Sequence, residues 1–459
     1  MDLLLTHGYF LREDSKELEI MRPYAPLGVL YLCSHLRAKG FDVEVFDSTF
    51  RDREELQSIL ASEKPAVLGV YANMMTRANA VKMLRVAKAA GWKTVVGGSD
   101  PAEYVSEYLD NGADVVVLGE GERTLEELLP ALPGGQTDLR RIDGIAFRAP
   151  DGVIHRTTPR APIRDLDAQP WPAREAIDLG PYMKAWREYH GKASLGLITA
   201  RGCPYRCRWC SRNVFGQTHR RRSASSVVDE LEFLISNYGP EMVWMADDVF
   251  TIHRGWLLEY AAELKKRGIS IPFETISRAD RMDEAVADAL ADIGCFRLWV
   301  GCESGSQRIL DQMQRDVTLE QVERAVGLLR SRGIATGMFL MWGYGDENLT
   351  DIQATIEHVK RAEPDVFFTT VAYPVKGTGF YSDVADRVVN ENAWDSTSDR
   401  DNRIRGRHSR RFYKFAYQLL RSEVELHRKG SRTPESSDLQ HAIMQARLGM
   451  RNTYGEVEA

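Results

Sequence analysis

The residues with the clearest chemical capacity are three cysteines that fall close together, Cys203, Cys207 and Cys210. Their spacing is C-x3-C-x2-C, within the segment Arg201–Cys210. Three thiolates on one short loop can bind three irons of a 4Fe–4S cube and leave the fourth iron open to a small molecule. The spacing therefore predicts an iron–sulfur centre with a free coordination position.

The competing interpretation of these cysteines is a structural zinc site. Tetrahedral zinc needs a fourth ligand at a matching spacing, and His219, the histidine near the motif, is poorly spaced for that role. A secreted disulfide framework would spread its cysteines along the chain instead. The other three, Cys33, Cys295 and Cys302, lie in apolar stretches and are expected to be buried small hydrophobic residues.

Length and composition limit the class of protein. The 459 residues are too many for one ordinary domain, so we expect two or three cores. No apolar run approaches the roughly 20 residues of a membrane helix, and the first residues predict a strand rather than a signal peptide. We therefore expect a cytoplasmic protein without a membrane span. The net charge of −6 gives no electrostatic reason to expect a nucleic-acid partner.

The first part of the chain alternates short strands with amphipathic helices. This pattern predicts an α/β fold with a doubly wound parallel sheet in residues 1–135. The expected strands are Leu3–Leu5, Val43–Phe46, Ala66–Tyr71, Thr94–Val96 and Asp114–Leu118. Ligands bind to such sheets beyond the carboxyl ends of the strands. The residues that the chain places there, and that we expect to contact a ligand, are Asn73, Gly97, Gly98, Gly119 and Glu120.

A second alternating series predicts a partial TIM-type barrel of six β/α units in residues 192–380. Its strands are expected at Ser194–Thr199, Met242–Met245, Ile271–Ile276, Phe296–Val300, Ala335–Met341 and Val366–Val371. In such barrels the chemistry lies at the carboxyl ends of the strands, and the cysteine loop directly follows the first one. Prolines and glycines interrupt residues 136–191, which we expect to form a linker with a short hairpin at Gly144–Ile154. Residues 381–459 are expected to form a helical C-terminal region, with a basic helix over Arg403–Arg421.

Residues 193–380 resemble the radical S-adenosylmethionine (SAM) enzymes, whose cysteine motif carries an aromatic residue before its third cysteine, here Trp209. The resemblance implies that the open iron chelates SAM and that one electron from the cluster releases a 5′-deoxyadenosyl radical. It also implies a small-molecule substrate, and an electron donor such as flavodoxin or ferredoxin.

Further matches to this family follow the second and third barrel strands. Asp247 and Asp248 stand where the family places a carboxylate that contacts the methionine amino group, although most members have Gly-Gly-Glu there. Which of the two takes that role is open, and a helix N-cap is the competing interpretation. Arg278 could pair with the methionine carboxylate, or it could be an ordinary surface arginine.

Two more matches follow the fourth and fifth strands. Glu303 and Ser304 lie in a segment that resembles the family's G-x-E-S-G-S, whose polar pair approaches the ribose or methionine end of SAM. Gly343 begins a segment that resembles the fifth-strand motif G-x-P-x-E, which packs on adenine, with Gly345 in place of the proline. The resemblance implies that these residues contact SAM.

Residues 1–135 resemble the cobalamin-binding domains that are fused to one branch of the radical SAM enzymes. The matching segments are Pro26–Leu32, Val96–Pro101 and Val117–Glu122. Gly97 and Gly98 offer a surface without side chains, which a large flat macrocycle needs for close approach. The competing interpretations are a nucleotide-binding Rossmann domain, which would need G-x-G-x-x-G after the first strand, and a sheet that binds no cofactor.

The motif D-x-H-x-x-G, which supplies an axial histidine in other cobalamin proteins, is absent. Leu5 and Phe10 stand where that motif has Asp and Gly, so we expect cobalamin bound without a protein histidine ligand and His7 to be a surface or capping residue. The run of three arginines at 220–222 is expected to be solvated.

The combined resemblance implies a cobalamin-dependent radical methyltransferase that acts on an unactivated carbon of a small molecule, lipid or natural-product intermediate. A radical cyclase or oxidoreductase with the same cofactors is a second hypothesis. A non-enzymatic metal-binding protein is a third. The cofactor set for the first two is a 4Fe–4S cluster, SAM and cobalamin.

Overall fold

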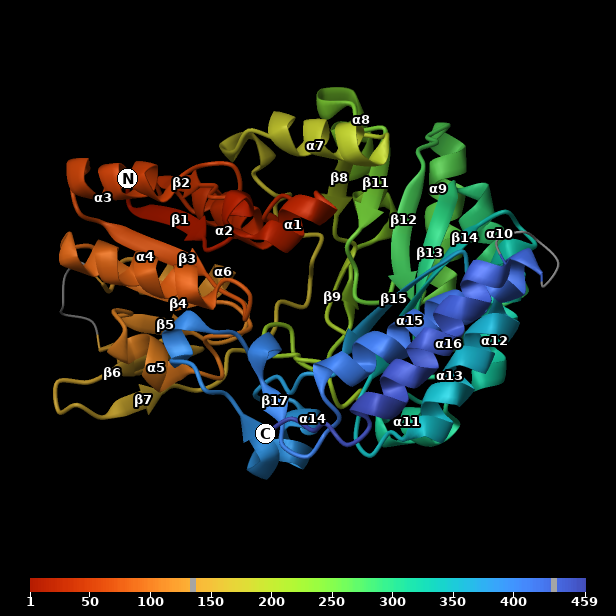
Figure 1. Cartoon of the computed structure of the whole chain (residues 1–459). Coiled ribbons are helices and arrows are strands. Elements are labelled where there is room, and N and C mark those ends of the chain that lie inside the picture. Colours follow the sequence, from red (N-terminus) through yellow and green to blue (C-terminus); the bar gives the residue numbers. More distant parts are fainter. Residues whose placement is uncertain (133–137, 431–435) are drawn as a thin grey trace. The chain divides into compact units, whose positions relative to one another are not determined.

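The computed structural model describes residues 1–132, 138–430 and 436–459, and Figure 1 shows the course of the chain. The chain divides into two compact units. Unit 1 comprises Met1–Pro204, Ser211–Trp244 and Asn392–Arg400. Unit 2 comprises Tyr205–Cys210, Met245–Glu391 and Asp401–Ala459. The predicted boundary at residues 135 and 136 lies outside the described residues.

Unit 1 is built around a sheet of order β2-β1-β3-β4-β5-β6-β7 (Figure 1). The first five strands in chain order are parallel, as the sequence predicts. They are β1 (Leu3–His7), β2 (Val43–Phe46), β3 (Val67–Tyr71), β4 (Lys93–Gly97) and β5 (Val115–Val117). The connecting helices are α2 (Leu27–Ala38), α3 (Arg53–Ser62), α4 (Arg77–Ala89), α5 (Val105–Asp110) and α6 (Glu122–Leu128), with a short α1 (Ser15–Ile20) before them. Leu4 belongs to one hydrophobic core, and Leu3 and Leu5 to another, because alternate strand residues point to opposite faces.

The predicted hairpin forms from β6 (Ile145–Arg148) and β7 (Ile154–Arg156), which pair in antiparallel fashion. The sequence assigned it to a linker, whereas β6 in fact pairs with β5 and extends the first sheet. Hydrogen bonding of the otherwise free edge of β5 explains this placement. Beyond the hairpin, α7 (Gly180–His190) precedes the next strand. The four-part division of the chain stays a prediction.

The second sheet has the order β15-β14-β13-β12-β11-β8, which gives the six strands of a partial barrel. The strands are β8 (Ser194–Leu197), β11 (Met242–Met245), β12 (Phe273–Ser277), β13 (Cys295–Glu303), β14 (Ala335–Trp342) and β15 (Val366–Val371). The pairs β12–β13, β13–β14 and β14–β15, all in unit 2, are parallel. The accompanying helices are α8 (Ala224–Tyr238), α9 (Arg254–Arg267), α10 (Glu284–Asp292), α11 (Gln307–Gln312), α12 (Leu319–Arg330) and α13 (Leu349–Ala362).

The C-terminal region is helical, as predicted, with α15 (Arg410–Lys429) packed against α16 (Ser436–Thr453). The predicted helix Arg403–Arg421 is wrong in its bounds, because Ser409 caps α15 by accepting a hydrogen bond from the amide of Phe412. Shorter elements complete the described chain: β9 (Ala200–Arg201), β10 (Arg220–Arg221), α14 (Gly379–Val384), β16 (Val388–Val389) and β17 (Arg403–Ile404). Across the described ranges, none of the helices combines the length and apolarity needed to cross a bilayer.

Candidate functional site

Unit 1 contains a cavity of about 880 Å³ beyond the carboxyl ends of β1, β3, β4 and β5. The start of α2 closes one side of it, and the segment after β1 closes another. All five residues that the sequence predicted as ligand contacts in this sheet line the cavity: Asn73, Gly97, Gly98, Gly119 and Glu120. The topology therefore brings together loops that lie far apart along the chain.

Seven glycines are among the residues that line this cavity. At Gly98, φ is +116°, and a Cβ there would lie 2.2 Å from the carbonyl oxygen of Ala72, so no other residue fits. Gly28 lies in the first turn of α2, and a Cβ there would have no atom within 4 Å. The open space beside Gly28 leaves room for a broad, flat group such as a corrin ring.

His7 is buried in the cavity wall, so it is not the surface residue that was one of the two predicted roles, whereas its ring does cap a backbone amide, that of Tyr9. Its Nε2 lies 2.9 Å from Oδ1 of Asp47, and its Nδ1 accepts a hydrogen bond from the amide of Tyr9 at 3.3 Å. Burial raises the pKa of Asp47, but the hydrogen bonds from His7, the amide of Thr49 and Tyr182, together with the charge interaction with His7, outweigh burial and lower this pKa. Both ring nitrogens of His7 are therefore engaged within the protein. That cobalamin binds without a histidine ligand stays a prediction, which this geometry supports.

The carboxylate of Glu120 is engaged by protein groups. Arg201 Nη1 donates to Oε1 at 2.9 Å, Arg220 Nη1 donates to Oε2 at 2.8 Å, and the amide of Ile163 donates at 2.7 Å. Arg201 also pairs with Glu122 at 2.7 Å. Since Arg201 lies two residues before Cys203, these ion pairs tie the loop after β5 to the strand that leads into the cysteine motif.

The expected solvation of the arginines at 220–222 is wrong. Besides the Arg220–Glu120 pair, Arg222 is buried and forms an ion pair with Glu230 of α8. Arg174 pairs with the other oxygen of Glu230 at 3.0 Å. A short charge run is solvated only when no acid is buried opposite it, and here the fold supplies two such acids.

In unit 2, Cys207 is buried beside two guanidinium groups. Arg315 Nη1 lies 3.7 Å from its Sγ and Arg278 Nη1 lies 3.8 Å from it. A hydrogen bond with Cys210 and the nearby positive charges of Arg315 and Arg278 outweigh burial and lower the pKa of Cys207 to about 5. The thiolate is the form that binds iron, so this donor chemistry fits a cluster ligand.

The other two cysteines of the motif are more accessible. Cys210 is exposed in unit 2, and Cys203 is half-buried in unit 1. Within the described ranges, no group of three or more His, Cys, Asp or Glu side chains is gathered closely enough to hold a metal ion. The remaining cysteines, Cys33, Cys295 and Cys302, are buried, as predicted.

Arg278 is buried, so its interpretation as a surface arginine is wrong. Its Nε donates to Asp280 at 2.8 Å, its Nη2 donates to the carbonyl oxygen of Arg315 at 2.8 Å, and its guanidinium lies 3.7 Å from the ring centre of Tyr205. Sequence reasoning missed Arg315, which also donates to the carbonyl oxygen of Gly301 at 2.8 Å. No motif or spacing points to Arg315, because its role depends on the turn that follows α11.

The polar residues at or just after the ends of β11 and β13 differ in exposure. Asp247 is buried and Asp248 is exposed. Glu303 is buried at a φ of +68°, and burial, partly offset by Arg315, raises its pKa to about 7. A strained backbone that presents a carboxyl group is a feature of functional sites. Ser304 is fully buried, and its Oγ accepts a hydrogen bond from the amide of Ser306 at 3.1 Å.

Gly343 lies at the end of β14 and lines a second cavity, of about 680 Å³, in unit 2. Its amide donates to Oε2 of Glu347 at 2.6 Å, and burial raises the pKa of Glu347 to about 8. Trp209 lies edge-on to Tyr344, with ring centres 6.5 Å apart. The aromatic residue of the cysteine motif thus packs on the segment that the sequence linked to adenine.

Comparison with known proteins shows the same two-part organisation. Residues 19–129 match the B12 binding domain and residues 197–359 match the Radical SAM superfamily. The uncharacterized methyltransferase PH0819 of Pyrococcus horikoshii is 30% identical over 361 residues, which cover 77% of this chain and 77% of that protein. The chain belongs to the cobalamin-dependent radical SAM enzymes.

Two further relatives extend this comparison. The anaerobic magnesium-protoporphyrin IX monomethyl ester cyclase of Rubrivivax gelatinosus is 29% identical over 385 residues, or 81% of this chain and 68% of that protein. The fold is similar to that of the radical SAM methyltransferase TsrM from Kitasatospora setae, solved with cobalamin and a 4Fe–4S cluster bound. The TM-score is 0.69 at 22% identity, over 84% of this chain and 74% of that one.

Family membership confirms the predicted cofactors, a 4Fe–4S cluster, SAM and cobalamin. The zinc, nucleotide-binding and non-enzymatic interpretations are therefore set aside. Cys203, Cys207 and Cys210 remain the predicted cluster ligands. The residues after the barrel strands remain predicted SAM contacts.

Proposed function

We propose that this cobalamin-dependent radical SAM enzyme is a methyltransferase acting on an unactivated carbon of a small molecule, lipid or natural-product intermediate. The observation that carries the proposal is the extent of the similarity to the methyltransferase PH0819, 30% identity over 77% of both chains. Both ring nitrogens of His7 are hydrogen-bonded within the protein, so this cavity residue would bind cobalamin without coordinating its metal.

When bound, cobalamin supplies a methyl carrier, and the cluster with SAM supplies a carbon-centred radical. The chain's own residues bind and orient these groups. The open space beside Gly28 lets a ring approach the backbone, and Arg278 and Arg315, together with the hydrogen bond to Cys210, favour the thiolate form of Cys207. The ion pairs of Glu120 with Arg201 hold the loop of one cofactor domain against the strand that leads to the cysteines.

A radical cyclase is the second candidate. It is supported by 29% identity to the magnesium-protoporphyrin IX monomethyl ester cyclase over 81% of this chain. The two reactions differ in what they do to SAM. Methyl transfer converts SAM into S-adenosylhomocysteine in addition to 5′-deoxyadenosine, whereas a cyclase needs the radical alone.

The test measures both nucleoside products. We expect the protein, reconstituted anaerobically with cluster and cobalamin and reduced chemically, to form S-adenosylhomocysteine in an amount comparable to the bound cobalamin. Protein without cobalamin is the matched control and should form none. Production of 5′-deoxyadenosine without any S-adenosylhomocysteine would refute methyl transfer and favour cyclisation. With a substrate in hand, deuterated SAM methyl groups should appear in the product.

The cluster assignment has its own test. Alanine at Cys203, Cys207 and Cys210 together should abolish 5′-deoxyadenosine formation, because no open iron would remain to chelate SAM. Cobalamin binding should persist in this variant, since the cavity in unit 1 contains none of the three cysteines. Retained 5′-deoxyadenosine formation would contradict the ligand assignment.

A further inference from the structure

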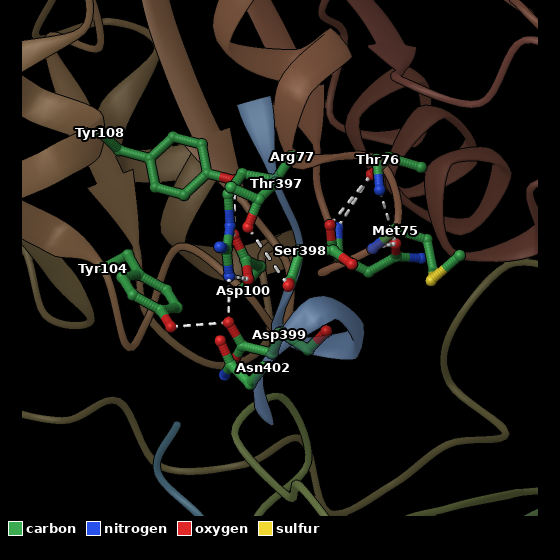
Figure 2. A network of polar contacts seen from close by, with 12 residues as sticks. Met75, Thr76, Arg77, Asp100, Tyr104, Tyr108, Thr397, Ser398, Asp399 and Asn402 are labelled. Atoms are coloured by element: carbon green, nitrogen blue, oxygen red, sulfur yellow. Dashed lines mark hydrogen bonds and ion pairs between the residues drawn. The ribbon is translucent and has the colours of Figure 1, made fainter. Parts of the chain in front are cut away.

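A short segment late in the chain, Asn392–Arg400, belongs to unit 1 although the residues on both sides of it belong to unit 2. Figure 2 shows its Asp399 directed at Arg77, the first residue of α4. Arg77 Nη2 donates to Asp399 Oδ1 at 2.7 Å and to Asp100 Oδ1 at 2.6 Å, and its Nε donates to Asp100 Oδ2 at 2.9 Å. All three side chains are about 2% exposed, so the contacts are shielded from water.

Aromatic side chains enclose these charges. Tyr104 donates its hydroxyl hydrogen to Asp399 at 2.7 Å, and Tyr108 donates to Asp100 at 2.7 Å. The Arg77 guanidinium lies 4.2 Å from the ring centre of Tyr104 and 5.2 Å from that of Trp394, which belongs to the same segment as Asp399. Burial raises the pKa values of both tyrosines, which keeps their hydroxyls as hydrogen-bond donors.

The charge balance of this cluster is unusual. Arg77 and Asp100 already form a neutral, doubly hydrogen-bonded pair. Asp399 adds a second buried carboxylate, whose desolvation is costly unless Arg77 and Tyr104 both bond to it. The segment can therefore dock only when Arg77, Asp100 and Tyr104 are correctly placed.

Arg77 and Asp100 are adjacent in sequence to two loops that line the cavity. Arg77 follows the loop Asn73–Thr76, of which Asn73, Met75 and Thr76 line the cavity. Asp100 follows the loop that contains Gly97 and Gly98, which also line it. Figure 2 shows Met75 and Thr76 beside this network. The side chain of Asn73 holds its own loop by accepting bonds from the amides of Met75 and Thr76. One buried ion cluster thus fixes the bases of two cavity loops.

We propose that Asp399 is a positioning residue for cobalamin: docking of 392–400 onto Arg77 and Asp100 orders the two loops that receive the cofactor. The proposal rests on the cofactor set of the family and not on the choice between methyl transfer and cyclisation. The effect is reciprocal by thermodynamic linkage. If docking of the segment strengthens cobalamin binding by a given factor, bound cobalamin strengthens docking of the segment by the same factor.

The test compares two substitutions within the segment, in the 459-residue chain. Asp399→Asn weakens the hydrogen bonds that Arg77 and Tyr104 donate to this residue, because an amide oxygen carries no net charge. It should weaken the binding of hydroxocobalamin about tenfold, within the usual range for coupled sites. Asp395→Asn is the matched control. Asp395 lies in the same segment as Asp399 and pairs with Arg85, which is on α4 like Arg77, but the two side chains of this pair are 30% and 50% exposed. It should bind cobalamin as the unmodified protein does, since exposed pairs contribute little.

Hydrogen exchange of 392–400 gives a second measurement that needs no variant. In the unmodified chain, hydroxocobalamin should slow amide exchange throughout the segment, and Asp399→Asn should abolish this protection. The proposal is overturned if cobalamin leaves exchange in the segment unchanged. It is also overturned if Asp399→Asn and Asp395→Asn weaken cobalamin binding equally. Should Asp399→Asn not fold, the exchange measurement on the unmodified chain decides alone.

Discussion

The buried ion pairs of Glu120 make it a sensitive position in unit 1. Its carboxylate accepts from Arg201 and Arg220, and the three side chains are 6%, 7% and 11% exposed, respectively. Glu120→Gln keeps the size of the side chain but removes its charge. Arg201 retains its pair with Glu122. Arg220 keeps hydrogen bonds to neutral oxygens such as the carbonyl of Ile163. These bonds do not replace the negative charge of Glu120 that compensates the charge of Arg220.

The magnitude follows from that geometry. Breaking one partner of a buried pair costs about 3–5 kcal/mol of unfolding free energy. Because Arg201 keeps Glu122, we expect the lower end, about 3 kcal/mol. For a domain of this size, each kcal/mol of unfolding free energy that is lost lowers the midpoint of thermal unfolding by about 2–4 °C. The expected decrease of the midpoint is therefore about 6–12 °C.

The assay is thermal unfolding of the cobalamin-free chain, with Glu127→Gln as the matched control. Glu127 lies on α6 and accepts two bonds from Arg160, at 2.8 and 2.6 Å, but its side chain is 47% exposed. It should lose less than about 1 kcal/mol. Equal midpoint shifts for the two variants would refute the reasoning. Weaker cobalamin binding by Glu120→Gln with an unchanged midpoint would show instead that Glu120 contacts the cofactor, as the sequence predicted.

Two further predictions concern the cavity wall and the response to pH. Gly98→Ala should lower both the midpoint of thermal unfolding and the affinity for cobalamin, because its Cβ would clash with Ala72. Gly28→Ala should stabilise α2 by up to about 1 kcal/mol. It should nevertheless weaken cobalamin binding, because its Cβ would fill part of the cavity. For Glu347, a native pKa of about 8 against 4.5 means that protonation stabilises the fold below pH 4.5 and that this contribution is lost as pH rises toward 8. In urea unfolding, the free energy of unfolding should fall less between pH 4.5 and 8 for Glu347→Gln than for the unmodified protein. An equal fall in the two proteins would contradict the raised pKa of Glu347.

Local patterns predicted the elements well because they depend on neighbours in sequence. The strands β2, β11 and β15 have the predicted bounds, and the other predicted strands of the two parallel series differ only at their ends, whereas the short strands β9, β10, β16 and β17 were not predicted. The glycines after β4 line the cavity because parallel strands end at one edge of their sheet. The basic helix was misplaced because the cap at Ser409, and not the start of the basic stretch, determines where α15 begins.

The amino-acid sequence by itself determined the two α/β halves, the cysteine spacing and the family, since each depends on periodicity or on a motif within one short segment. Only the tertiary structure decided which charges neutralise one another. Glu120 meets Arg201 across 81 residues and Arg77 meets Asp399 across 322. A buried charge is stable only beside its partner, and no local pattern in the sequence records which distant residue the fold brings to it.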